Sequence, residues 1–432
     1  MNYKETIRYL YDTAPLFQQV GTKAYKEGLE NSYAIDSILN HPHRNIRTIH
    51  VAGTNGKGST SHLITSILKQ SGYRAGLYTS PHLIDFKERV KINGEPIEER
   101  FVIDFVADYK DFIEEMNASF FELTTALAFQ YFAEKKVDVA VVEVGLGGRL
   151  DCTNIIRPDL SIITNISFDH VALLGDTLTA IAKEKAGIIK SGIPVVIGET
   201  TEETKKVFLE TVDQVHGNRN RIYFAEEIQP VSSARLLSSG KWQFETKNYG
   251  TITGELGGYA QEKNATTVLT AIDELKKSGY KIPVEAVKSG FEKVVENTGL
   301  LGRWQIIQTN PKIVLDIGHN EAGIKYIVQQ LQSEIYEKLH IVIGMVNDKD
   351  IDAVLQLLPR KANYYFTQAS IPRALDRGQL KIKAGEYGLK GNDYPTVGEA
   401  ISAAKSAAGE KDFIFVGGST FIVADALKSM NQ

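Results

Sequence analysis

The chain has 432 residues, a length that predicts two or three domains, and its composition of 43% hydrophobic and 24% charged residues is typical of a globular protein. A formal net charge of -4 argues against a general nucleic-acid-binding protein, because such proteins normally carry a basic face. The single cysteine, Cys152, excludes an internal disulfide framework and a cysteine-rich zinc site, and it fits a reducing compartment.

No segment of the sequence has the roughly eighteen consecutive apolar residues that a membrane-spanning helix requires. Residues 1–6 also lack the apolar core of a secretory signal. We therefore expect a cytoplasmic protein without a membrane partner or a nucleic-acid partner.

Short apolar runs alternate with helical patterns along the chain, which predicts parallel α/β architecture. The predicted strands form one series at residues 46–52, 73–79, 137–144, 160–166 and 193–197, and a second series at residues 312–317, 339–343, 364–367 and 412–416. Residues 200–256 instead predict a helix followed by short strands, which is a small β addition to the first domain. Two glycines interrupt the periodicity at residues 297–302, so we expect domains at 1–297 and 298–432.

A glycine-rich loop lies between the predicted strand at residues 46–52 and a predicted helix that Gly72 ends. Backbone N–H groups of such a loop can surround phosphate oxygens, Lys57 can reach the outer phosphates, and a hydroxyl at Ser59 or Thr60 can hold Mg²⁺. The pattern therefore predicts an ATP site. The alternative is a tight turn that is merely rich in glycine, since Val51 replaces the distal glycine of the general motif. The candidate ATP contacts in the loop are Thr54, Asn55, Gly56, Lys57, Gly58, Ser59 and Thr60.

The predicted fold class is α/β, with an N-terminal phosphate-loop ATPase domain on a parallel sheet and a C-terminal Rossmann-like domain. Glu143 and His170 each lie near the carboxyl end of a predicted strand, the edge where parallel sheets gather ligands. A carboxylate with hydroxyl groups is an expected Mg²⁺ ligand set, whereas a histidine is a less usual ligand. His170 taken alone can also be a polar loop residue.

Lys185 breaks the pattern of a helix predicted at residues 176–190, with Asp176 as its N-terminal cap. At about 100° per residue, Lys185 falls within the apolar face, whereas Lys183 and Lys190 point away from it. An inward ammonium group must be paired, extend to the surface or lose its charge. A lysine with a lowered pKa can also react with CO₂ to form a carbamate, which could orient Mg²⁺ ligands. The pattern alone leaves these alternatives open.

Two further segments have both a structural and a binding interpretation. Ser119 and Glu122 match a capping box at the start of a helix. The segment at residues 147–151 can be a simple turn, but it directly follows the strand that carries Glu143. Neither interpretation excludes the other, so both segments are candidates for a substrate pocket.

The phosphate loop at residues 53–59 resembles that of the Mur ligase superfamily, and specifically its folylpolyglutamate synthase branch. Further segments resemble blocks of the same family in the same order. These segments are residues 79–83, 88–90, 121–124, 143–151, 165–170, 183–188, 302–304 and 316–320. The chain differs from the family at Ala260, where the family usually has a histidine.

The resemblance implies roles for single residues. Ser80, Glu143 and His170 match the surroundings of the family's second metal ion, with Ser59 as the hydroxyl ligand beside the phosphates. Lys185 matches a lysine that is carbamylated in several Mur ligases, which makes it a candidate catalytic residue together with Lys57, Asp316 and His319. The family's bifunctional members resemble the chain near a candidate dihydropteroate pocket formed by Gly28, Leu29, Phe121, Glu122, Leu150 and Asp151.

Residues of the second domain match groups that meet ATP and the incoming amine. Asp316 ends a predicted strand and could accept hydrogen bonds from nucleotide hydroxyls or the amine, while Arg303 and His319 could meet phosphate charge. Asn264 matches an ATP-contacting asparagine of the family. The candidate ATP contacts outside the loop are thus Asn264, Arg303 and Asp316.

The implied activity is that of an ATP-dependent ligase that adds L-glutamate to a folate, and also to dihydropteroate, through an acyl phosphate with Mg²⁺ as cofactor. We expect a monomer whose partners are ATP, L-glutamate and a reduced folate or dihydropteroate. The alternatives are a monofunctional folylpolyglutamate synthase and a phosphate-loop ATPase that acts as a regulatory switch. We do not expect a cell-wall ligase, because the 52 residues before Gly53 leave no room for the separate domain of those enzymes.

Overall fold

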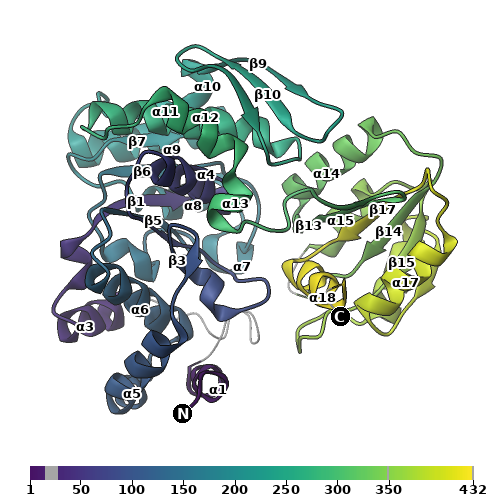
Figure 1. The fold of residues 1–432 in the computed structure, drawn as a ribbon, viewed down its shortest axis with the longest axis horizontal. Coiled ribbons are helices and arrows are strands. Elements are labelled where there is room, and N and C mark those ends of the chain that lie inside the picture. The colour runs from purple at the N-terminus through teal and green to yellow at the C-terminus, as the bar shows by residue number, and fades with distance from the viewer. Residues whose placement is uncertain (15–27, 348–349, 431–432) are drawn as a thin grey trace. The chain divides into compact units, whose positions relative to one another are not determined.

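The structure is a computed structural model that describes residues 1–14, 28–347 and 350–430, and the chain forms two compact units (Figure 1). Unit 1 comprises Met1–Glu255 and Gln261–Leu300, and unit 2 comprises Leu256–Ala260 and Leu301–Gln432. Among the described helices, none combines the length and the apolar character that a membrane span requires.

Unit 1 is built on an eight-stranded sheet with the order β4-β3-β2-β5-β1-β6-β7-β8. Neighbours from β2 to β8 in this order are parallel, whereas β3 and β4 add an antiparallel edge that the sequence pattern did not predict. Central strands such as β5 are buried along their whole length, which is why they read as continuous apolar runs. The strands are β1 (Arg47–Ala52), β2 (Ala75–Tyr78), β3 (Val90–Ile92), β4 (Glu95–Pro96), β5 (Val139–Glu143), β6 (Leu160–Ile163), β7 (Val195–Ile197) and β8 (Ile222–Phe224).

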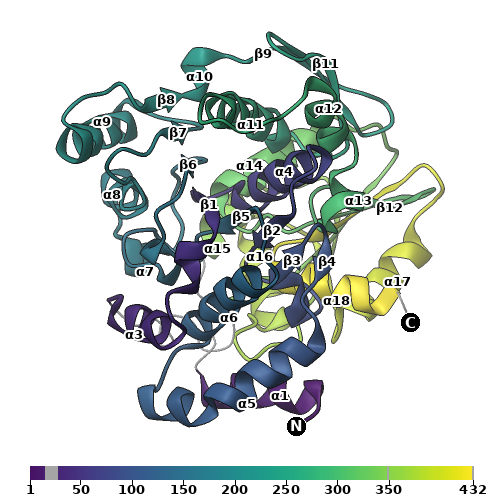
Figure 2. The ribbon, with the colours of Figure 1, turned by 60° about the vertical axis from the view of Figure 1, so that its left-hand side comes forward.

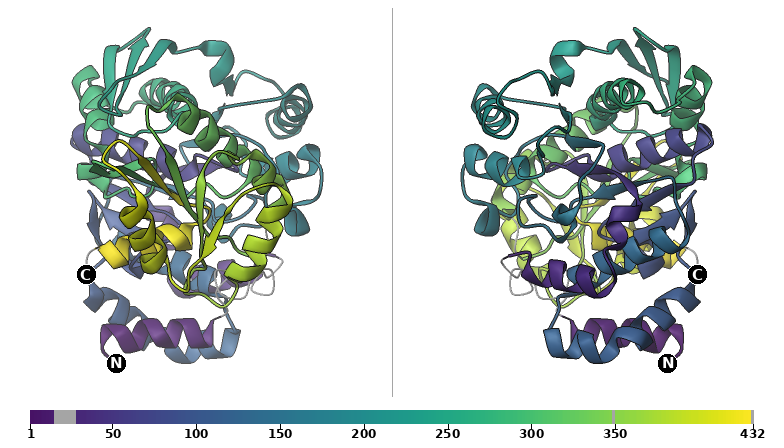
Figure 3. Two further views of the ribbon diagram at one scale, coloured as in Figure 1. Left: turned by 90° about the vertical axis from the view of Figure 1, so that its right-hand side faces the viewer. Right: turned by 90° about the vertical axis from the view of Figure 1, so that its left-hand side faces the viewer.

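Helices cover both faces of this sheet. One core contains apolar side chains of α1, α5 and α6, and α1 runs alongside α5 (Figures 2 and 3). A second core joins α8 and α9 to β6 and β7, and α4 packs on β1, β2 and β5. The helices are α1 (Tyr3–Thr13), α3 (Glu30–Ile38), α4 (Lys57–Gln70), α5 (Glu99–Met116), α6 (Phe120–Glu134), α7 (Val171–Leu174), α8 (Leu178–Ala186), α9 (Glu202–His216), α10 (Ala225–Ile228), α11 (Ala260–Lys277), α12 (Val284–Glu292) and α13 (Val294–Thr298).

A three-stranded antiparallel sheet completes unit 1 and confirms the predicted β addition. Its order is β11-β10-β9, and α12 packs against β11 (Figure 2). The strands are β9 (Val231–Leu236), β10 (Trp242–Thr246) and β11 (Gly250–Gly254).

Unit 2 is a Rossmann-like α/β layer structure around a six-stranded sheet with the order β12-β13-β17-β14-β15-β16. All neighbours are parallel except the β12 edge, and strand and helix side chains form one apolar core. The elements are β12 (Gln305–Thr309), β13 (Lys312–Asp316), α14 (Glu321–Ser333), β14 (Leu339–Ile343), α15 (Ile351–Leu357), β15 (Asn363–Phe366), α16 (Arg377–Glu386), β16 (Gly391–Asp393), α17 (Val397–Ala407), β17 (Phe413–Gly417) and α18 (Thr420–Met430).

The helix predicted at residues 176–190 is shorter in the structure, where α8 spans Leu178–Ala186. The predicted cap at Asp176 is wrong, because the Thr177 side chain accepts the hydrogen bond from the Ala180 N–H group at 3.1 Å. The helix ends at Ala186, and Gly187 is its C-terminal cap.

Candidate active site

The phosphate loop leaves the carboxyl end of β1 in the middle of the sheet and leads directly into α4. Gly56 precedes the helix with φ 82°, and no side chain caps the first turn, so its backbone N–H groups are available to an anion. Two glycines are required by space as well as by conformation. A Cβ atom at Gly53 would collide with Thr164 Oγ1, and one at Gly56 would collide with Asn264 Oδ1.

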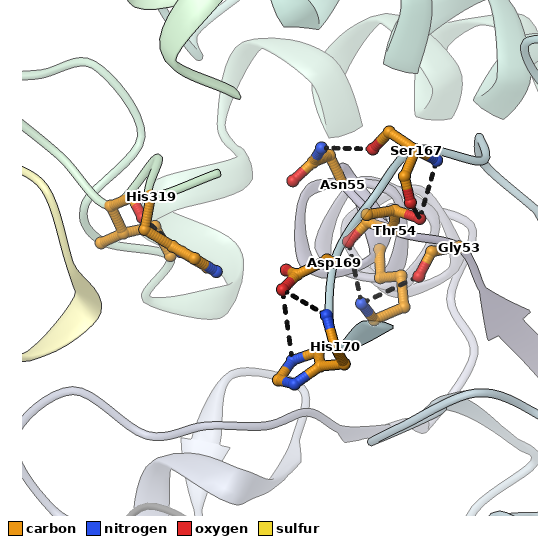
Figure 4. Close-up of polar contacts among 9 residues, drawn as sticks. Gly53, Thr54, Asn55, Ser167, Asp169, His170 and His319 are labelled. Atoms are coloured by element: carbon orange, nitrogen blue, oxygen red, sulfur yellow. Dashed lines mark hydrogen bonds and ion pairs between the residues drawn. The ribbon is translucent and has the colours of Figure 1, made fainter. Parts of the chain in front are cut away.

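The segment after β6 holds the loop in place through hydrogen bonds (Figure 4). Asn55 N donates to Asn165 Oδ1 at 3.0 Å, and Asn55 Nδ2 donates to Ser167 Oγ at 3.3 Å. Thr54 Oγ1 donates to Ser167 O and accepts from Ser167 N, at 3.1 and 3.0 Å. The backbone of the phosphate loop is thus fixed by the segment that follows β6. Sequence reasoning did not assign this function to residues 164–167, although residues 165–170 form one of the family-like segments.

Positive charge gathers at the loop. Lys57 Nζ donates to Gly53 O at 3.1 Å and to Thr54 O at 3.2 Å, which holds the ammonium group over the loop. The start of α4 adds the partial positive charge of its macrodipole. The site therefore fits a polyphosphate group.

The buried hydroxyl groups near the phosphate loop are possible ligands of Mg²⁺. Ser59 is buried, and its Oγ accepts a long hydrogen bond of 3.4 Å from Gln261 Nε2. Thr60 Oγ1 is buried without a hydrogen-bond partner in the part of the chain that the structure describes. Hydroxyl oxygens with spare bonding capacity suit a hard cation, so the set fits Mg²⁺. Gln261 also accepts from Asn264 Nδ2 at 3.0 Å, and the sequence analysis did not select it.

Strand order brings Glu143 and Ser80 together. Glu143 ends β5 opposite Val51 of β1, and Ser80 follows the neighbouring strand β2. Ser80 N donates to Glu143 Oε2 at 3.2 Å, and the glutamate side chain is buried. Two candidate metal ligands that are distant in sequence thus meet at the carboxyl edge of the sheet, beside the strand that carries the phosphate loop.

His170 follows β6 on the other side of β1 and has φ 52° at the start of α7. Its backbone N–H donates to Asp169 Oδ1 at 2.8 Å, and its Nε2 lies 3.8 Å from the same oxygen (Figure 4). Asp169 adds a carboxylate at the edge that holds the phosphate loop. The sequence analysis did not select Asp169, although the residue lies within a family-like segment. Within residues 1–14, 28–347 and 350–430, no group of three His, Cys, Asp or Glu side chains is arranged to hold a metal ion.

Lys185 lies inward, as its place in the apolar face predicts. Its side chain is only 4% exposed, whereas Lys183 on the same helix is exposed. Burial, together with the like charge of Lys57, lowers the pKa of Lys185 to about 7, although the carboxylates of Asp169, Asp151 and Glu184 act in the opposite direction. A large fraction of this amine is therefore neutral near pH 7.

Asp151 organises its own loop. Its carboxylate accepts hydrogen bonds from Leu146 N at 2.8 Å, from Thr153 N at 3.0 Å and from Thr153 Oγ1. Burial raises the pKa of Asp151, and these hydrogen bonds oppose the shift. His50 Nε2 lies 2.8 Å from Thr153 Oγ1 and extends the buried network. A structural function for Asp151 is therefore evident, and its assignment to a substrate pocket stays a prediction.

The predicted capping box at the start of α6 is confirmed. Glu122 N donates to Ser119 Oγ at 3.3 Å, and Ser119 N donates to Glu122 Oε2 at 2.6 Å. The neighbouring Phe121 packs against Gly145 so closely that a Cβ atom there would collide with its ring. The Phe121 ring also lies 6.0 Å from that of Tyr78. This residue therefore provides an aromatic wall beside the end of β5.

The six residues of the predicted substrate pocket lie in three segments of unit 1. Gly28 has φ 108°, and Leu29 is the N-terminal cap of α3. Leu150 is half-buried directly before Asp151. Two of these segments, residues 121–122 and 150–151, lie beside the loop that follows β5. Phe121 packs against Gly145 of that loop, and Asp151 accepts a hydrogen bond from Leu146 N.

Unit 2 holds Asp316 at the end of β13. Asp316 Oδ2 accepts from Trp304 N at 2.7 Å, and Oδ1 accepts from Gly318 N at 2.8 Å. Burial raises the pKa of Asp316, while the Gly318 hydrogen bond and the positive charge of Arg303 oppose the shift. His319 Nδ1 lies 3.0 Å from Ile317 O, so this nitrogen carries a proton and donates it to the carbonyl oxygen.

The chain joins a parallel sheet that carries a glycine-rich phosphate loop to a Rossmann-like unit, and Mur ligase family models match both parts, so the chain is an ATP-dependent ligase of the Mur type. The Mur ligase middle domain matches residues 51–272, and the Mur ligase glutamate ligase domain matches residues 302–420. The chain is 33% identical over 416 residues to the dihydrofolate synthase/folylpolyglutamate synthase of Bacillus subtilis, with 94% of this chain and 95% of that protein covered. The chain belongs to the dihydrofolate synthase/folylpolyglutamate synthase family.

Solved structures agree with this assignment. Escherichia coli FolC in complex with DHPP and ADP superimposes with a TM-score of 0.84 at 28% identity, over 100% of this chain and 98% of that chain. A bifunctional folylpolyglutamate synthase/dihydrofolate synthase with Mn, AMPPNP and L-glutamate bound gives a TM-score of 0.81 at 29% identity, over 100% and 98%.

Proposed function

We propose that this protein uses ATP to join L-glutamate to the side-chain carboxylate of a reduced folate. The observation that carries the proposal is the combination, in one chain, of the Lys57 phosphate loop with a match to the glutamate ligase domain. The relative with Mn, AMPPNP and L-glutamate bound supports the same set of substrates for this chain.

The reaction needs two group transfers. A carboxylate oxygen of the folate attacks the γ-phosphorus of ATP, and the bond from that phosphorus to the bridging oxygen breaks. The products of this step are ADP and an acyl phosphate of the folate. The neutral amine of glutamate then attacks the acyl carbon, the bond from that carbon to the phosphate oxygen breaks, and an amide, phosphate and a proton result. A free carboxylate acylates amines poorly, so phosphorylation supplies the leaving group.

The loop of unit 1 serves the first transfer. Lys57 and the uncapped N–H groups of α4 balance the charge that moves onto the γ-phosphate and ADP. The ATP contacts that we propose are Thr54, Asn55, Gly56, Lys57, Gly58, Ser59 and Thr60, with Asn264, Arg303 and Asp316. Ser59, Ser80, Glu143 and His170 would hold Mg²⁺, which neutralises phosphate charge when it is bound.

The second transfer involves residues that we assign to the incoming amine. Asp316 could orient the amine and accept its proton, and His319 could meet the departing phosphate. We also propose that Lys185 carries a carbamate, because its buried amine has a pKa near neutrality and lies close to the charges of Lys57 and Asp169. The acyl phosphate hydrolyses in water, so this chemistry requires a site from which water is excluded.

A second activity, dihydrofolate synthesis, is supported by the relative that binds DHPP together with ADP. Dihydropteroate presents a benzoate carboxylate, whereas a folate presents the carboxylate of an attached glutamate, which lies farther from the pteridine ring. Two ring positions are then needed. We propose that the pocket for dihydropteroate includes Gly28, Leu29, Phe121, Glu122, Leu150 and Asp151.

We further propose that residues 1–297 form the ATP-binding domain and residues 298–432 the ligase domain of a cytoplasmic monomer without a nucleic-acid partner. The match of the glutamate ligase domain from residue 302 supports this division, and the single Cys152 is consistent with a reducing compartment. Size-exclusion chromatography with light scattering would measure the oligomeric state.

An assay of radiolabelled glutamate incorporation tests the main proposal, with tetrahydrofolate and dihydropteroate supplied separately. Incorporation with both acceptors is expected. Incorporation with tetrahydrofolate alone would mean a monofunctional folylpolyglutamate synthase. ATP hydrolysis that neither glutamate nor a folate accelerates, without incorporation, would contradict ligase activity and favour a regulatory ATPase.

A further inference from the structure

The helix that follows the phosphate loop also holds the start of the segment that leads out of unit 1. α13 ends at Thr298, and the division between the compact units falls after Leu300. α4 contacts both α12 and α13 (Figure 2). We call Asn297 and Thr298 the linker root. The phosphate loop and the linker root are therefore attached to the same helix.

Three side chains of α4 fix Asn297. Asn297 Nδ2 donates to Ser66 Oγ at 2.9 Å, and Gln70 Nε2 donates to Asn297 Oδ1 at 3.1 Å. Lys69 Nζ donates to Asn297 O at 3.3 Å. Ser66 is anchored in turn, because its hydroxyl donates to Gly290 O at 2.7 Å. Both the side chain and the backbone carbonyl of Asn297 are thereby held.

Thr298 is held by its own helix α13, by α4 and by the edge strand β3. Its Oγ1 donates to Val294 O at 2.6 Å, so its single proton is used and it accepts from His62 Nδ1 at 2.8 Å. Lys91 Nζ, from the edge strand β3, donates to Thr298 O at 2.8 Å. Thr298 is fully buried, and His62 and Lys91 are each 5% exposed.

The buried polar contacts that α4 and β3 make with the linker root form a cluster. Its polar character indicates that it fixes the orientation of the linker root, in addition to holding it against α4. His62, Ser66 and Gln70 recur at intervals of four residues, so they form one stripe along α4. Buried polar groups lose their hydration and gain little net stability, but a fully bonded set permits one geometry only. The approach is also tight, since a Cβ atom at Gly94 would collide with Asn297 O.

We propose that His62, Asn297 and Thr298 are positioning residues that set the direction in which the linker leaves the phosphate-loop domain. This inference rests on the proposed ligase function. The acyl phosphate formed at the loop must meet an amine at near-bonding distance, and a shift of about 1 Å can cost about a hundredfold in rate. A loosened linker root therefore lowers the rate of ligation and leaves nucleotide binding at the loop intact.

Two substitutions at Thr298 and a matched control on α4 test the inference. Thr298→Val removes the hydroxyl and keeps the shape, whereas Thr298→Ser keeps the hydroxyl. Thr65→Val is the control, because Thr65 is equally buried on α4 but donates to Ser61 O at 2.8 Å, within the helix. For each variant, kcat of glutamate ligation, the Kd for ADP and Tm are measured.

We expect Thr298→Val to lower kcat at least about tenfold and to change the Kd for ADP by a much smaller factor, because most of the proposed nucleotide contacts lie on the loop itself. Thr298→Ser should recover kcat to within about threefold, and Thr65→Val should change Tm without changing kcat. Lys91→Met removes the hydrogen bond that Lys91 of β3 donates to the Thr298 carbonyl oxygen. It should therefore reproduce the loss of kcat even if Thr298→Val fails to fold.

A wild-type kcat in folded Thr298→Val or Lys91→Met protein would overturn the inference. An equal loss of ADP affinity and kcat would also overturn it, because the cluster would then merely support the phosphate loop. Absence of glutamate incorporation by the wild-type protein would instead contradict the proposed function on which the inference rests.

Discussion

Lys185 can be tested by substitutions that separate its chemistry from its packing. Lys185→Ala removes the side chain, Lys185→Met keeps an unbranched apolar chain in the buried position, and Lys183→Ala changes an exposed lysine on the same helix. We expect both Lys185 variants to lose nearly all ligation, because neither can form a carbamate. Lys183→Ala should keep wild-type activity.

The pKa of Lys185 determines which fraction of its amine is neutral near pH 7. Burial and the neighbouring charge of Lys57 lower this pKa from 10.5 to about 7, so about half of the amine is neutral at pH 7, compared with about one part in 3,000 for an ordinary lysine. The neutral amine is the form that reacts with CO₂. The fold therefore raises the reactive fraction about a thousandfold.

The same shift predicts how stability depends on pH. The pKa of Lys185 is lower in the folded state than in the unfolded state, so the unfolded chain binds more protons between about pH 7 and 10.5. Burial of the protonated Lys185 lowers the free energy of unfolding. This destabilisation has its full size below about pH 7, amounts to about 4 kcal/mol at pH 7, and disappears as the pH rises to 10.5. In buffer depleted of CO₂, Lys185→Met should raise the free energy of unfolding at pH 7 and lose this pH dependence.

Incorporation of radiolabelled glutamate, with and without added acetate, is the decisive assay. Acetate should partly restore Lys185→Ala, because the small carboxylate can enter the vacated space, and should not restore Lys185→Met, in which that space is filled. More than about a tenth of wild-type turnover by Lys185→Ala without acetate would refute a catalytic carbamate. Failure of acetate to restore any activity would favour a lysine that acts as a free amine.

Three further substitutions probe the loop and the predicted pocket. Lys57→Ala should abolish ligation with little change in Tm, because residues 164–167 hold the loop backbone, and turnover above about a tenth of wild type would contradict this. Gly56→Ala should weaken ADP binding at least about tenfold in calorimetry, because its Cβ atom costs about 1–2 kcal/mol at φ 82° and collides with Asn264; unchanged affinity would argue against a rigid loop. Asp151→Ala should impair kcat/KM for dihydropteroate more than for tetrahydrofolate and also lower Tm, whereas equal losses for both acceptors would assign Asp151 to the shared chemistry.

Local patterns in the sequence were sufficient for the elements that carry the site. The predicted strand at residues 46–52 corresponds to β1, and the glycine loop leads into α4, because buried parallel strands are continuous apolar runs and glycine marks turns that other residues cannot adopt. The inward position of Lys185 followed from helical periodicity. The same rules failed at the start of α8, where the adjacent Asp176 and Thr177 are both good caps and only the observed backbone geometry identifies Thr177.

The sequence by itself determined what each segment is, because hydrogen bonding within helices and the alternation of strand side chains are local properties. Only the tertiary structure decided which distant groups meet. Ser80 reaches Glu143 because β2 lies next to β5 in the sheet, an order that chain order does not reveal. The carboxylate of Asp151 is occupied by its own loop, and α4 binds Asn297 across more than 200 residues of sequence. Such partners depend on how the layers pack, and a polar residue at the end of a strand or helix looks the same in sequence whichever neighbour it finally contacts.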